Sequence, residues 1–506
     1  MNTLLTRRDF LKLAGLLSLS YATPQSYFDL TATIETKENV LIIVFDAWSA
    51  SNISLLGYGR KTTPFLERLT EKAIVYHNHY AGGHFTTPGT ASLLTGTTPW
   101  THQAFTFNGT VDESILHRNI FRSFQQYHRL AYTHNPLANT LLRQFIADIS
   151  DFTPWEHLYL ENDPLINTLF KNDYDVASIS WNRAMKRLEE GYAYSLFLSQ
   201  IYEGYKKRRV EEILPEFPRG IPNYDGLAFF SLKEAIDWLS WLIGSAPQPF
   251  MGYFHFLPPH DPYHTHTDYY DAFAGDGYHP QKKAHHILRG DYSDTTINQQ
   301  RRWYDEYILN VDMEFARLYS FLEQRGVLNN TWLILTSDHG EMFERGILAH
   351  NQPVYHRPVI NIPLVIFPPH QQTRIDIHDR TSVIDLLPTL LKVTGQNIPE
   401  WAEGIVLPPF SEPTAETQPE ITTIHVQERD GNGIIIAATA LLVRGNYKLM
   451  WYFGYEQLDG EEYIELFDIA SDPEEINNLY PHKKDTADEF LGILASKLEL
   501  LNQVHQ

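Results

Sequence analysis

The chain contains no cysteine in its 506 residues. No disulfide can hold the fold, and no thiol can act as a nucleophile or bind a metal. Basic residues are also scarce: 40 Lys and Arg stand against 62 Asp and Glu, which gives a formal net charge of −22. Such an acidic surface repels nucleic acid and anionic membranes, so we expect no nucleic acid and no membrane surface as a partner.

Long apolar runs are missing as well. The most apolar internal segment, residues 226–244, carries three charged residues and contains a capping box formed by Ser231 and Glu234. It predicts an amphipathic helix that packs on a core, and not a transmembrane anchor. Hydrophobic residues make up 43% of the chain, which is ample for a core. The length allows one large α/β domain with an appendage, or two to four smaller domains.

The first 22 residues are typical of an export signal. Paired arginines in TRRDFLK, residues 6–12, precede an apolar stretch, and Ser20 and Ala22 form a small-x-small cleavage pattern. The alternative is an ordinary N-terminal helix. We predict a twin-arginine signal peptide over residues 1–22. The mature protein would then be periplasmic or extracellular, without a transmembrane anchor.

Apolar runs alternate with helical periodicity, which predicts an α/β fold with a wound sheet flanked by helices. The runs, read as buried parallel strands, are residues 40–45, 250–256, 332–336 and 363–367. The helical segments are residues 64–76, 231–243, 307–326 and 382–395, the last interrupted by Pro388.

From about residue 410 the pattern changes to short β-like runs with turn signals, followed by a helical segment at 485–501. It predicts a smaller C-terminal antiparallel β subdomain with a terminal helix. We therefore expect a catalytic domain over residues 38–405, with an insertion at 155–225, and a C-terminal subdomain over 410–506.

Carboxylates follow two of the predicted strands. Asp46 ends the first strand and Asp338 the third, and His339 comes directly after Asp338. Ligands of wound sheets gather at the carboxyl ends of the strands. Together with a hydroxyl oxygen, two carboxylates and an imidazole could hold one divalent cation.

A hydroxyl group is available in GGHFTTPGTASLLTG, residues 82–96. This segment predicts a helix with Pro88 in its first position and Thr86 just ahead of it, where free backbone N–H groups suit an anion. Thr86 is then either a helix cap or a nucleophile whose hydroxyl is activated by a metal.

Several motifs in a fixed order resemble the sulfatase family of the alkaline-phosphatase superfamily, over residues 39–480. They are the first strand with its aspartate, TTPGTASLLTG, PHDPY, TSDHGE, TSVIDLLPTLLKVTG and ELFDIASDPEEINNL. The resemblance implies an alkaline-phosphatase-like fold. It implies a metal bound by Asp46, Thr86, Asp338 and His339. It also implies that His260 and His350 contact the substrate or protonate a leaving group, although either could be a loop histidine bonded to backbone.

The departures from the family pattern favour phosphorus chemistry. Sulfatases convert a Cys or Ser at the position of Thr86 to formylglycine, and a threonine is not expected to yield that aldehyde. The motif's arginine is Thr90, the second aspartate is Ala47, and a Gly-Lys-Trp-His segment is replaced by THNPLA, residues 133–138. A threonine in this ligand set resembles lipoteichoic-acid synthases and phosphoethanolamine transferases, which act through a phospho-threonine.

The sequence therefore predicts an exported, metal-dependent hydrolase or transferase that cleaves a phosphoester through Thr86. We expect one divalent ion (Zn, Mn, Mg or Ca), no formylglycine, and a small-molecule, lipid-headgroup or glycan ester as substrate. Two alternatives stay open: a sulfuric ester hydrolase, and a non-catalytic binder of anionic glycans. His260, His264 and His266 could hold a second metal. One metal is favoured, because Thr265 stands where an Asp-x-x-x-His pattern needs a histidine.

Overall fold

A computed structural model describes residues 37–160, 204, 207–224, 226, 228–411 and 419–503. The export signal expected at residues 1–22 and most of the insertion expected at 155–225 lie outside the described residues. Residues 37–506 make up one compact unit. Among the described residues, no helix has the length and apolar character needed to cross a membrane.

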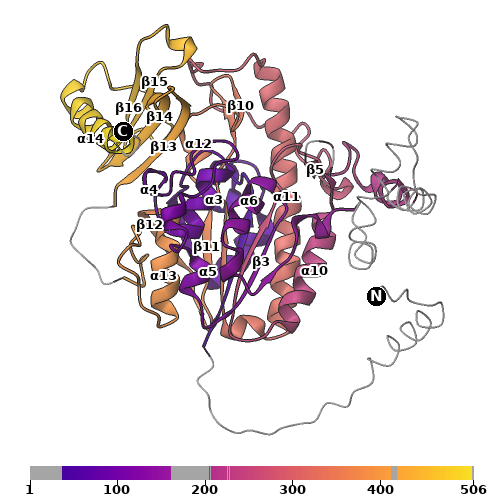
Figure 1. Ribbon diagram of the computed structural model, residues 1–506. Helices are drawn as coiled ribbons and strands as arrows, with labels where there is room; N and C mark the ends of the chain where they lie inside the picture. Colours follow the sequence, from indigo (N-terminus) through magenta and orange to yellow (C-terminus); the bar gives the residue numbers. More distant parts are fainter. Residues whose placement is uncertain are drawn as a thin grey trace, which may run out of the picture. The chain divides into compact units, whose positions relative to one another are not determined.

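A mixed sheet lies among helices at the centre of this unit (Figure 1). It has eight strands in the order β12-β2-β11-β8-β1-β7-β3-β4. The strands are β1 (Asn39–Phe45), β2 (Ile74–Tyr80), β3 (His128–Thr133), β4 (Asp151–Phe152), β7 (Phe250–Phe256), β8 (Thr331–Thr336), β11 (Leu364–Phe367) and β12 (Ile375–Ser382). Neighbours pair in parallel, except that β11 is antiparallel to both β2 and β8. The α/β prediction is confirmed. The parallel direction expected for residues 363–367 is wrong, because a short buried run reads the same in either direction.

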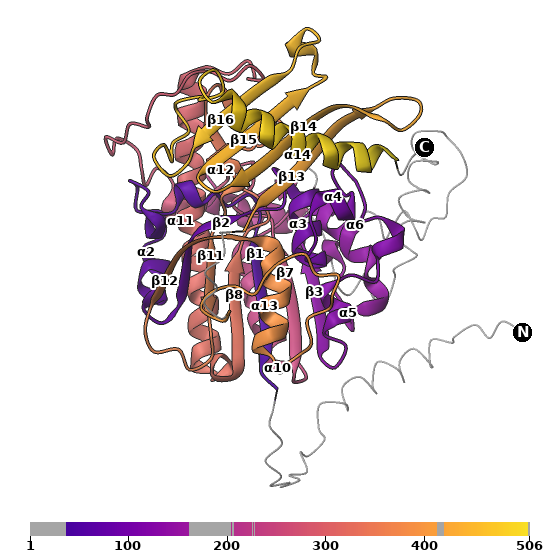
Figure 2. The same cartoon turned by 90° about the vertical axis from the view of Figure 1, so that its left-hand side faces the viewer.

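Strand β1 shows how the sheet buries both of its faces. Leu41, Ile43 and Phe45 belong to one core cluster, and the alternate residues 40, 42 and 44 belong to the other. The first cluster includes side chains from α2 (Pro64–Leu69), α10 (Leu232–Ser245) and α11 (Asp294–Gln324). The second includes side chains from α3 (Thr86–Thr95), α5 (Ile120–Ser123), α6 (Pro136–Gln144) and α13 (Leu386–Val393) (Figure 2).

Some helix limits differ from the prediction. The helix expected at 64–76 ends at Leu69, because the β-branched and aromatic residues at 74–76 begin β2. The helix expected at 382–395 begins at Leu386, so Pro388 lies in its first turn, where a missing N–H is tolerated, and does not interrupt it. The helix expected at 307–326 begins earlier, at Asp294.

A second sheet has the strands β13 (Ile421–Arg429), β14 (Ile435–Arg444), β15 (Tyr447–Phe453) and β16 (Tyr463–Asp468), all antiparallel, and α14 (Lys484–Gln503) packs on it. The predicted antiparallel sheet and terminal helix are confirmed. Other short elements of the described chain include α4 (Pro99–His102), α12 (Arg357–Ile360), and the pairs β5 (Asn223–Tyr224) with β6 (Ala228–Phe229) and β9 (Met342–Glu344) with β10 (Ile347–Ala349).

Candidate active site

Asp46 and Asp338 follow the ends of two neighbouring parallel strands, β1 and β8, so they lie at the same edge of the sheet. Ala47 takes a left-handed backbone conformation, with φ of 59°. Its N–H donates to Asp338 Oδ1 over 3.2 Å, and the His339 N–H donates to the same oxygen over 3.0 Å. These bonds orient the carboxylate and leave its other oxygen, Oδ2, for a different partner.

Helix α3 brings Thr86 to this edge. The helix begins at Thr86, with Phe85 as its N-cap residue, and so starts two residues earlier than expected. Thr86 is therefore not the N-cap residue, and Pro88 lies in the first turn. Gly89 permits a close approach, because a Cβ there would lie 2.2 Å from the Asp338 carbonyl oxygen. The positive end of the helix is thus held against the carboxylates.

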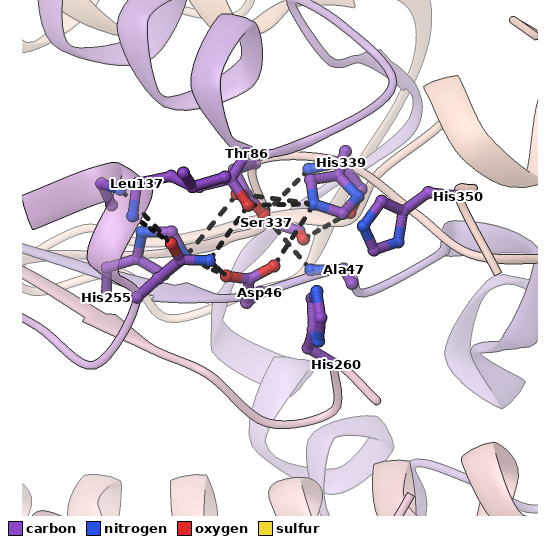
Figure 3. A network of polar contacts seen from close by, with 12 residues as sticks. Asp46, Ala47, Thr86, Leu137, His255, His260, Ser337, His339 and His350 are labelled. Carbon is purple, nitrogen blue, oxygen red and sulfur yellow. Dashed lines mark hydrogen bonds and ion pairs between the residues drawn. The ribbon is translucent and has the colours of Figure 1, made fainter. Parts of the chain in front are cut away.

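The Thr86 hydroxyl, Asp46 and His339 are turned toward one another (Figure 3). Thr86 Oγ1 lies 3.4 Å from His339 Nε2 and accepts a 3.1 Å hydrogen bond from Asn135 Nδ2. Thr86 is 2% exposed, and both aspartates and His339 are fully buried. The four residues expected to hold a metal therefore meet in one place.

Two carboxylate oxygens in this cluster, Asp46 Oδ1 and Asp338 Oδ2, have no hydrogen-bond partner. His339 Nε2 lies 3.3 Å from the first and 3.7 Å from the second. The ligand atoms of these three residues all lie within 4.8 Å of one another. Buried carboxylate oxygens without a donor are costly, and a divalent cation would satisfy both. The residues present therefore fit a bound divalent ion.

The charges of the cluster lead to the same conclusion. Burial raises the pKa of Asp46, but the nearby His255 and His339 rings outweigh it and hold that pKa well below 3.8. Burial lowers the pKa of His339, but Asp338 and Asp46 outweigh it and raise that pKa to about 9. Two buried carboxylates thus require a positive charge beside them. A metal ion on His339 Nε2 would replace the proton that supplies it.

Two residues that the sequence analysis did not single out complete the cluster. Asn135 Nδ2 donates to Asp46 Oδ2 over 2.6 Å as well as to Thr86, and Asn135 Oδ1 caps helix α6. His255, near the end of β7, places Nε2 3.1 Å from the same Asp46 oxygen. The available signals were an Asn-Pro pair at a helix start and a histidine inside an apolar run.

His260 and His350 lie beside the cluster, with ring centroids 4.9 Å apart. The His350 ring is 4.4 Å from that of His339, and its Nδ1 lies 3.3 Å from Glu341 Oε2. His260 Nδ1 lies 2.7 Å from the carbonyl oxygen of Asp261. Both rings line the pocket described next, so both can reach a group bound at Thr86.

A pocket of about 590 Å³ opens onto Thr86. Its described lining residues come from several elements: His84, Phe85, Thr86, Phe107, Asn135, Leu137, Asn223, Tyr224, Gly226, His260, Asp261, Pro262, His350, Asn351, Pro353, His425 and Gln427. This described lining contains no Lys or Arg, and Asp261 is its one carboxylate. His425 and Gln427 belong to β13, so the C-terminal sheet forms part of the wall.

His264 and His266, considered together with His260 as ligands of a second metal, each face another partner. His264 Nδ1 lies 3.1 Å from the Ile221 carbonyl oxygen, and His266 Nδ1 accepts the Asp268 N–H over 3.2 Å. Within the described part of the chain, neither belongs to a group of three potential ligands.

A further group, His286, His356 and Glu465, is also close enough to bind a metal. His286 Nδ1 accepts the Leu288 N–H over 3.1 Å. The neutral ring therefore carries its hydrogen on Nε2, the atom that faces Glu465, 3.4 Å away. A nitrogen that carries a hydrogen cannot ligate a metal, so the group at Asp46, Asp338 and His339 is the better fit.

His102 supports the helix that carries Thr86, and it makes stability depend on pH. Its Nδ1 accepts the Ala104 N–H over 3.0 Å, and its Nε2 lies 3.0 Å from Ser92 Oγ in α3. Burial lowers the pKa of His102 from 6.5 to about 3. The folded protein therefore favours the neutral ring. The contribution of His102 to the free energy of unfolding is complete above pH 6.5 and is lost as pH falls toward 3, by up to about 1.4 kcal/mol per pH unit.

We therefore expect His102→Gln to reduce the loss of stability between pH 6.5 and 5, measured as the urea unfolding free energy at each pH. The exposed His482→Gln is the matched control and should keep the wild-type slope. A parallel slope for His102→Gln and wild type would contradict this role.

Residues 38–396 match the family model described as Sulfatase, and residues 350–503 match the model described as N-sulphoglucosamine sulphohydrolase, C-terminal. The chain belongs to the sulfatase family. The family lies in the alkaline phosphatase superfamily, and its fold is the mixed sheet with a C-terminal four-stranded sheet described above. This sulfatase-family protein is accordingly an ester hydrolase of that superfamily.

Relatives of this sulfatase-family chain span nearly its whole length. It is 25% identical to the multifunctional alkaline phosphatase superfamily protein PehA of Trinickia caryophylli, over 88% of this chain and 91% of PehA. It is 22% identical to arylsulfatase K of Bos taurus, over 92% and 83%. The phosphonate monoester hydrolase of Agrobacterium radiobacter shares the fold, with a TM-score of 0.65 and 19% identity over 93% and 96% of the two chains.

Proposed function

We propose that this sulfatase-family protein cleaves a phosphoester, with a diester as the main substrate class, and that Thr86 is the nucleophile. The observation that carries the proposal is the position of Thr86 Oγ1, at the start of α3 and between Asn135 and His339. A hydroxyl held among metal-ligand side chains at a positive helix end is suited to attack as an alkoxide. PehA, described as a multifunctional alkaline phosphatase superfamily protein, supports a substrate range beyond sulfate esters.

Asp46, Thr86, Asp338 and His339 would hold one divalent cation, Zn, Mn, Mg or Ca. When bound, the cation supplies a positive charge that lowers the pKa of the Thr86 hydroxyl and offsets the charge of the phosphoryl oxygens. Asn135 acts through its amide group, which donates to Thr86 Oγ1 and stabilises negative charge on that oxygen.

The reaction proceeds in two displacements. Thr86 Oγ forms a bond to phosphorus as the bond to the ester oxygen breaks, and the hydroxyl proton passes to solvent. The departing oxygen takes a proton from His260 or His350, which line the same pocket. Water then attacks phosphorus and gives a proton to the histidine that lost one, while Thr86 Oγ departs and regains a proton from solvent. An alcohol in place of water gives transfer instead of hydrolysis.

Threonine chemistry favours phosphorus over sulfur. A formylglycine hydrate ejects sulfate by using its second hydroxyl, and a sulfated threonine has no such group. A phospho-threonine needs no second hydroxyl, because water or an alcohol can displace it in line. The similarity to arylsulfatase K keeps a sulfuric ester hydrolase as the second candidate. A non-catalytic glycan binder is less well supported, since it would not need the unpartnered carboxylate oxygens of Asp46 and Asp338.

The proposal is tested with a matched panel of p-nitrophenyl esters: a phosphodiester, a phosphomonoester and a sulfate ester, each with zinc, manganese or magnesium. We expect the phosphodiester to have the highest kcat/KM. A sulfate ester that is cleaved at least about tenfold faster would favour the second candidate. If none of the three esters is cleaved with any of the metals, a non-catalytic binder of anionic glycans would be the favoured function.

We also propose that the protein is exported by the twin-arginine route, as a catalytic domain of residues 38–405 with a C-terminal subdomain of 410–506. The motif at residues 6–12 supports export. Replacing Arg7 and Arg8 together with Lys should retain the protein in the cytoplasm, as seen by fractionation, whereas the single change Lys12→Arg should not. Normal export of the double variant would contradict the signal assignment.

A further inference from the structure

Strand β13 is fastened to the loop that leads into the nucleophile helix. Thr423 Oγ1 donates to the Gly82 carbonyl oxygen over 2.6 Å, and Trp100 Nε1 donates to Thr422 Oγ1 over 3.0 Å. These bonds fix the position of β13 along the pocket that opens onto Thr86. The C-terminal sheet is therefore a rigid wall of that pocket.

Alternate residues of a strand share one face, so Thr423 and His425 point to the same side of β13. Gln427 lies on that side too, because its Oε1 is 3.2 Å from His425 Nε2. His425 contacts the loop before the nucleophile, with its ring centroid 4.7 Å from that of His84. Gln427 is exposed and also lines the pocket. Along this side of β13, Thr423 bonds to the loop, His425 packs against it, and Gln427 lines the pocket.

The pairing of β13 with β14 is irregular at this point. Val426 pairs with Ala438 and Glu428 with Ala437, so the register shifts across Gln427. Such a bulge re-aims a side chain and is found beside active sites. The irregularity falls on the residue that reaches over the pocket, and this is a second, independent sign that its direction matters.

The chemistry of this wall is neutral. His425 Nε2 lies 3.2 Å from Gln427 Oε1, and burial lowers the pKa of His425 to about 4, so at neutral pH the ring donates to the amide carbonyl. The amide nitrogen of Gln427 then keeps its hydrogens for a ligand. Phe107, 66% exposed, offers an aromatic face in the same pocket. Neutral donors and acceptors beside an aromatic ring suit hydroxyl groups on a carbon frame.

We infer that Gln427, held by His425, is a specificity-determining residue that binds the substituent left on the ester after the leaving group departs. That substituent is uncharged and bears hydroxyl groups, such as a glycerol or sugar unit. The inference rests on the ester chemistry proposed above. The described lining, which has no Lys or Arg, also disfavours substituents with a second negative charge.

The test uses three p-nitrophenyl phosphodiesters with the same leaving group: methyl, 2,3-dihydroxypropyl and 2-carboxyethyl. We expect wild-type kcat/KM for the dihydroxypropyl ester to exceed those of the other two by about tenfold, a size typical for one or two hydrogen bonds to a substrate. Gln427→Leu should abolish this preference and leave the methyl ester within about threefold of wild type. Gln427→Lys should raise kcat/KM for the carboxyethyl ester.

Glu428→Gln is the matched control, because this exposed neighbour is not among the described lining residues of the pocket and should keep the wild-type preference. An unchanged dihydroxypropyl-to-methyl ratio in Gln427→Leu would overturn the inference, as would an equal loss in the control. Binding can be measured without turnover in Thr86→Ala. The dissociation constants of the same esters, with and without Gln427→Leu, then give the preference for the dihydroxypropyl over the methyl ester. If the dihydroxypropyl ester binds more tightly than the methyl ester but wild type hydrolyses neither, the proposed reaction is wrong and the binding role of Gln427 is supported.

Discussion

Replacing Thr86 with alanine should lower kcat by at least about three orders of magnitude and leave the fold intact. The expectation follows from the hydroxyl's surroundings: it lies among Asn135, His339 and the carboxylates, and Phe85 is the N-cap of α3. Loss of a helix cap would cost only about 1 kcal/mol of stability and leave the chemistry mostly unchanged. Kinetics with the p-nitrophenyl phosphodiester and a thermal melt separate the two roles.

Two variants sharpen this measurement. Thr86→Ser keeps a hydroxyl at the same position and should retain part of the activity. Thr87→Ala removes the neighbouring buried hydroxyl, which has no hydrogen-bond partner, and should stay near wild type in rate. If Thr87→Ala were inactive and Thr86→Ala active, the nucleophile would be Thr87 and our assignment of Thr86 would be wrong.

The covalent intermediate that we propose would offer a direct readout. Wild-type protein quenched during turnover should carry a phosphoryl group on the peptide that contains Thr86, and high-resolution mass spectrometry distinguishes it from a sulfonyl group. Near-wild-type turnover by Thr86→Ala, with a melting temperature a few degrees lower, would show a structural residue and refute the mechanism.

The sheet and the meeting of Asp46, Asp338 and His339 at its edge could be predicted from the sequence because their signals are local. A continuous apolar run that ends in Asp46 or Asp338 marks both a buried strand and the residue at its carboxyl end. The direction of β11 could not be predicted, because a short strand that is buried on both faces has the same apolar pattern in either direction. Nor could the exact start of α3, because Pro88 is compatible with any position in the first turn.

Contacts between segments that are distant in the sequence could not be predicted from its patterns. Asn135 at the start of α6 and His255 in β7 both reach Asp46, and a single asparagine or histidine carries no periodic signal. The same holds for Gln427, which lines the pocket from β13, a strand that Thr423 bonds to the loop at Gly82. Side chains that act across the fold become visible once the sheet order and the docking of the second sheet are known.

Asp338→Asn should remove both the bound metal and the activity. Asp338 Oδ1 accepts the N–H groups of Ala47 and His339, and Asp338 Oδ2 has no partner. Asparagine can keep the first oxygen as an acceptor, whereas its NH₂ group in place of Oδ2 cannot ligate a cation. The substitution therefore deletes a metal ligand and preserves the backbone turn, which Asp338→Ala would leave with two unsatisfied N–H groups.

Elemental analysis of the purified wild-type protein should find about one equivalent of a divalent metal, and Asp338→Asn should fall below about one tenth of that. Glu465→Gln is the matched control: it alters the other buried carboxylate–histidine group and should keep the metal, since His286 there carries its hydrogen toward Glu465. Loss of metal in Glu465→Gln but not in Asp338→Asn would move the metal to that second group. Turnover by metal-free wild type in the presence of a chelator would refute a metal-dependent reaction at Thr86.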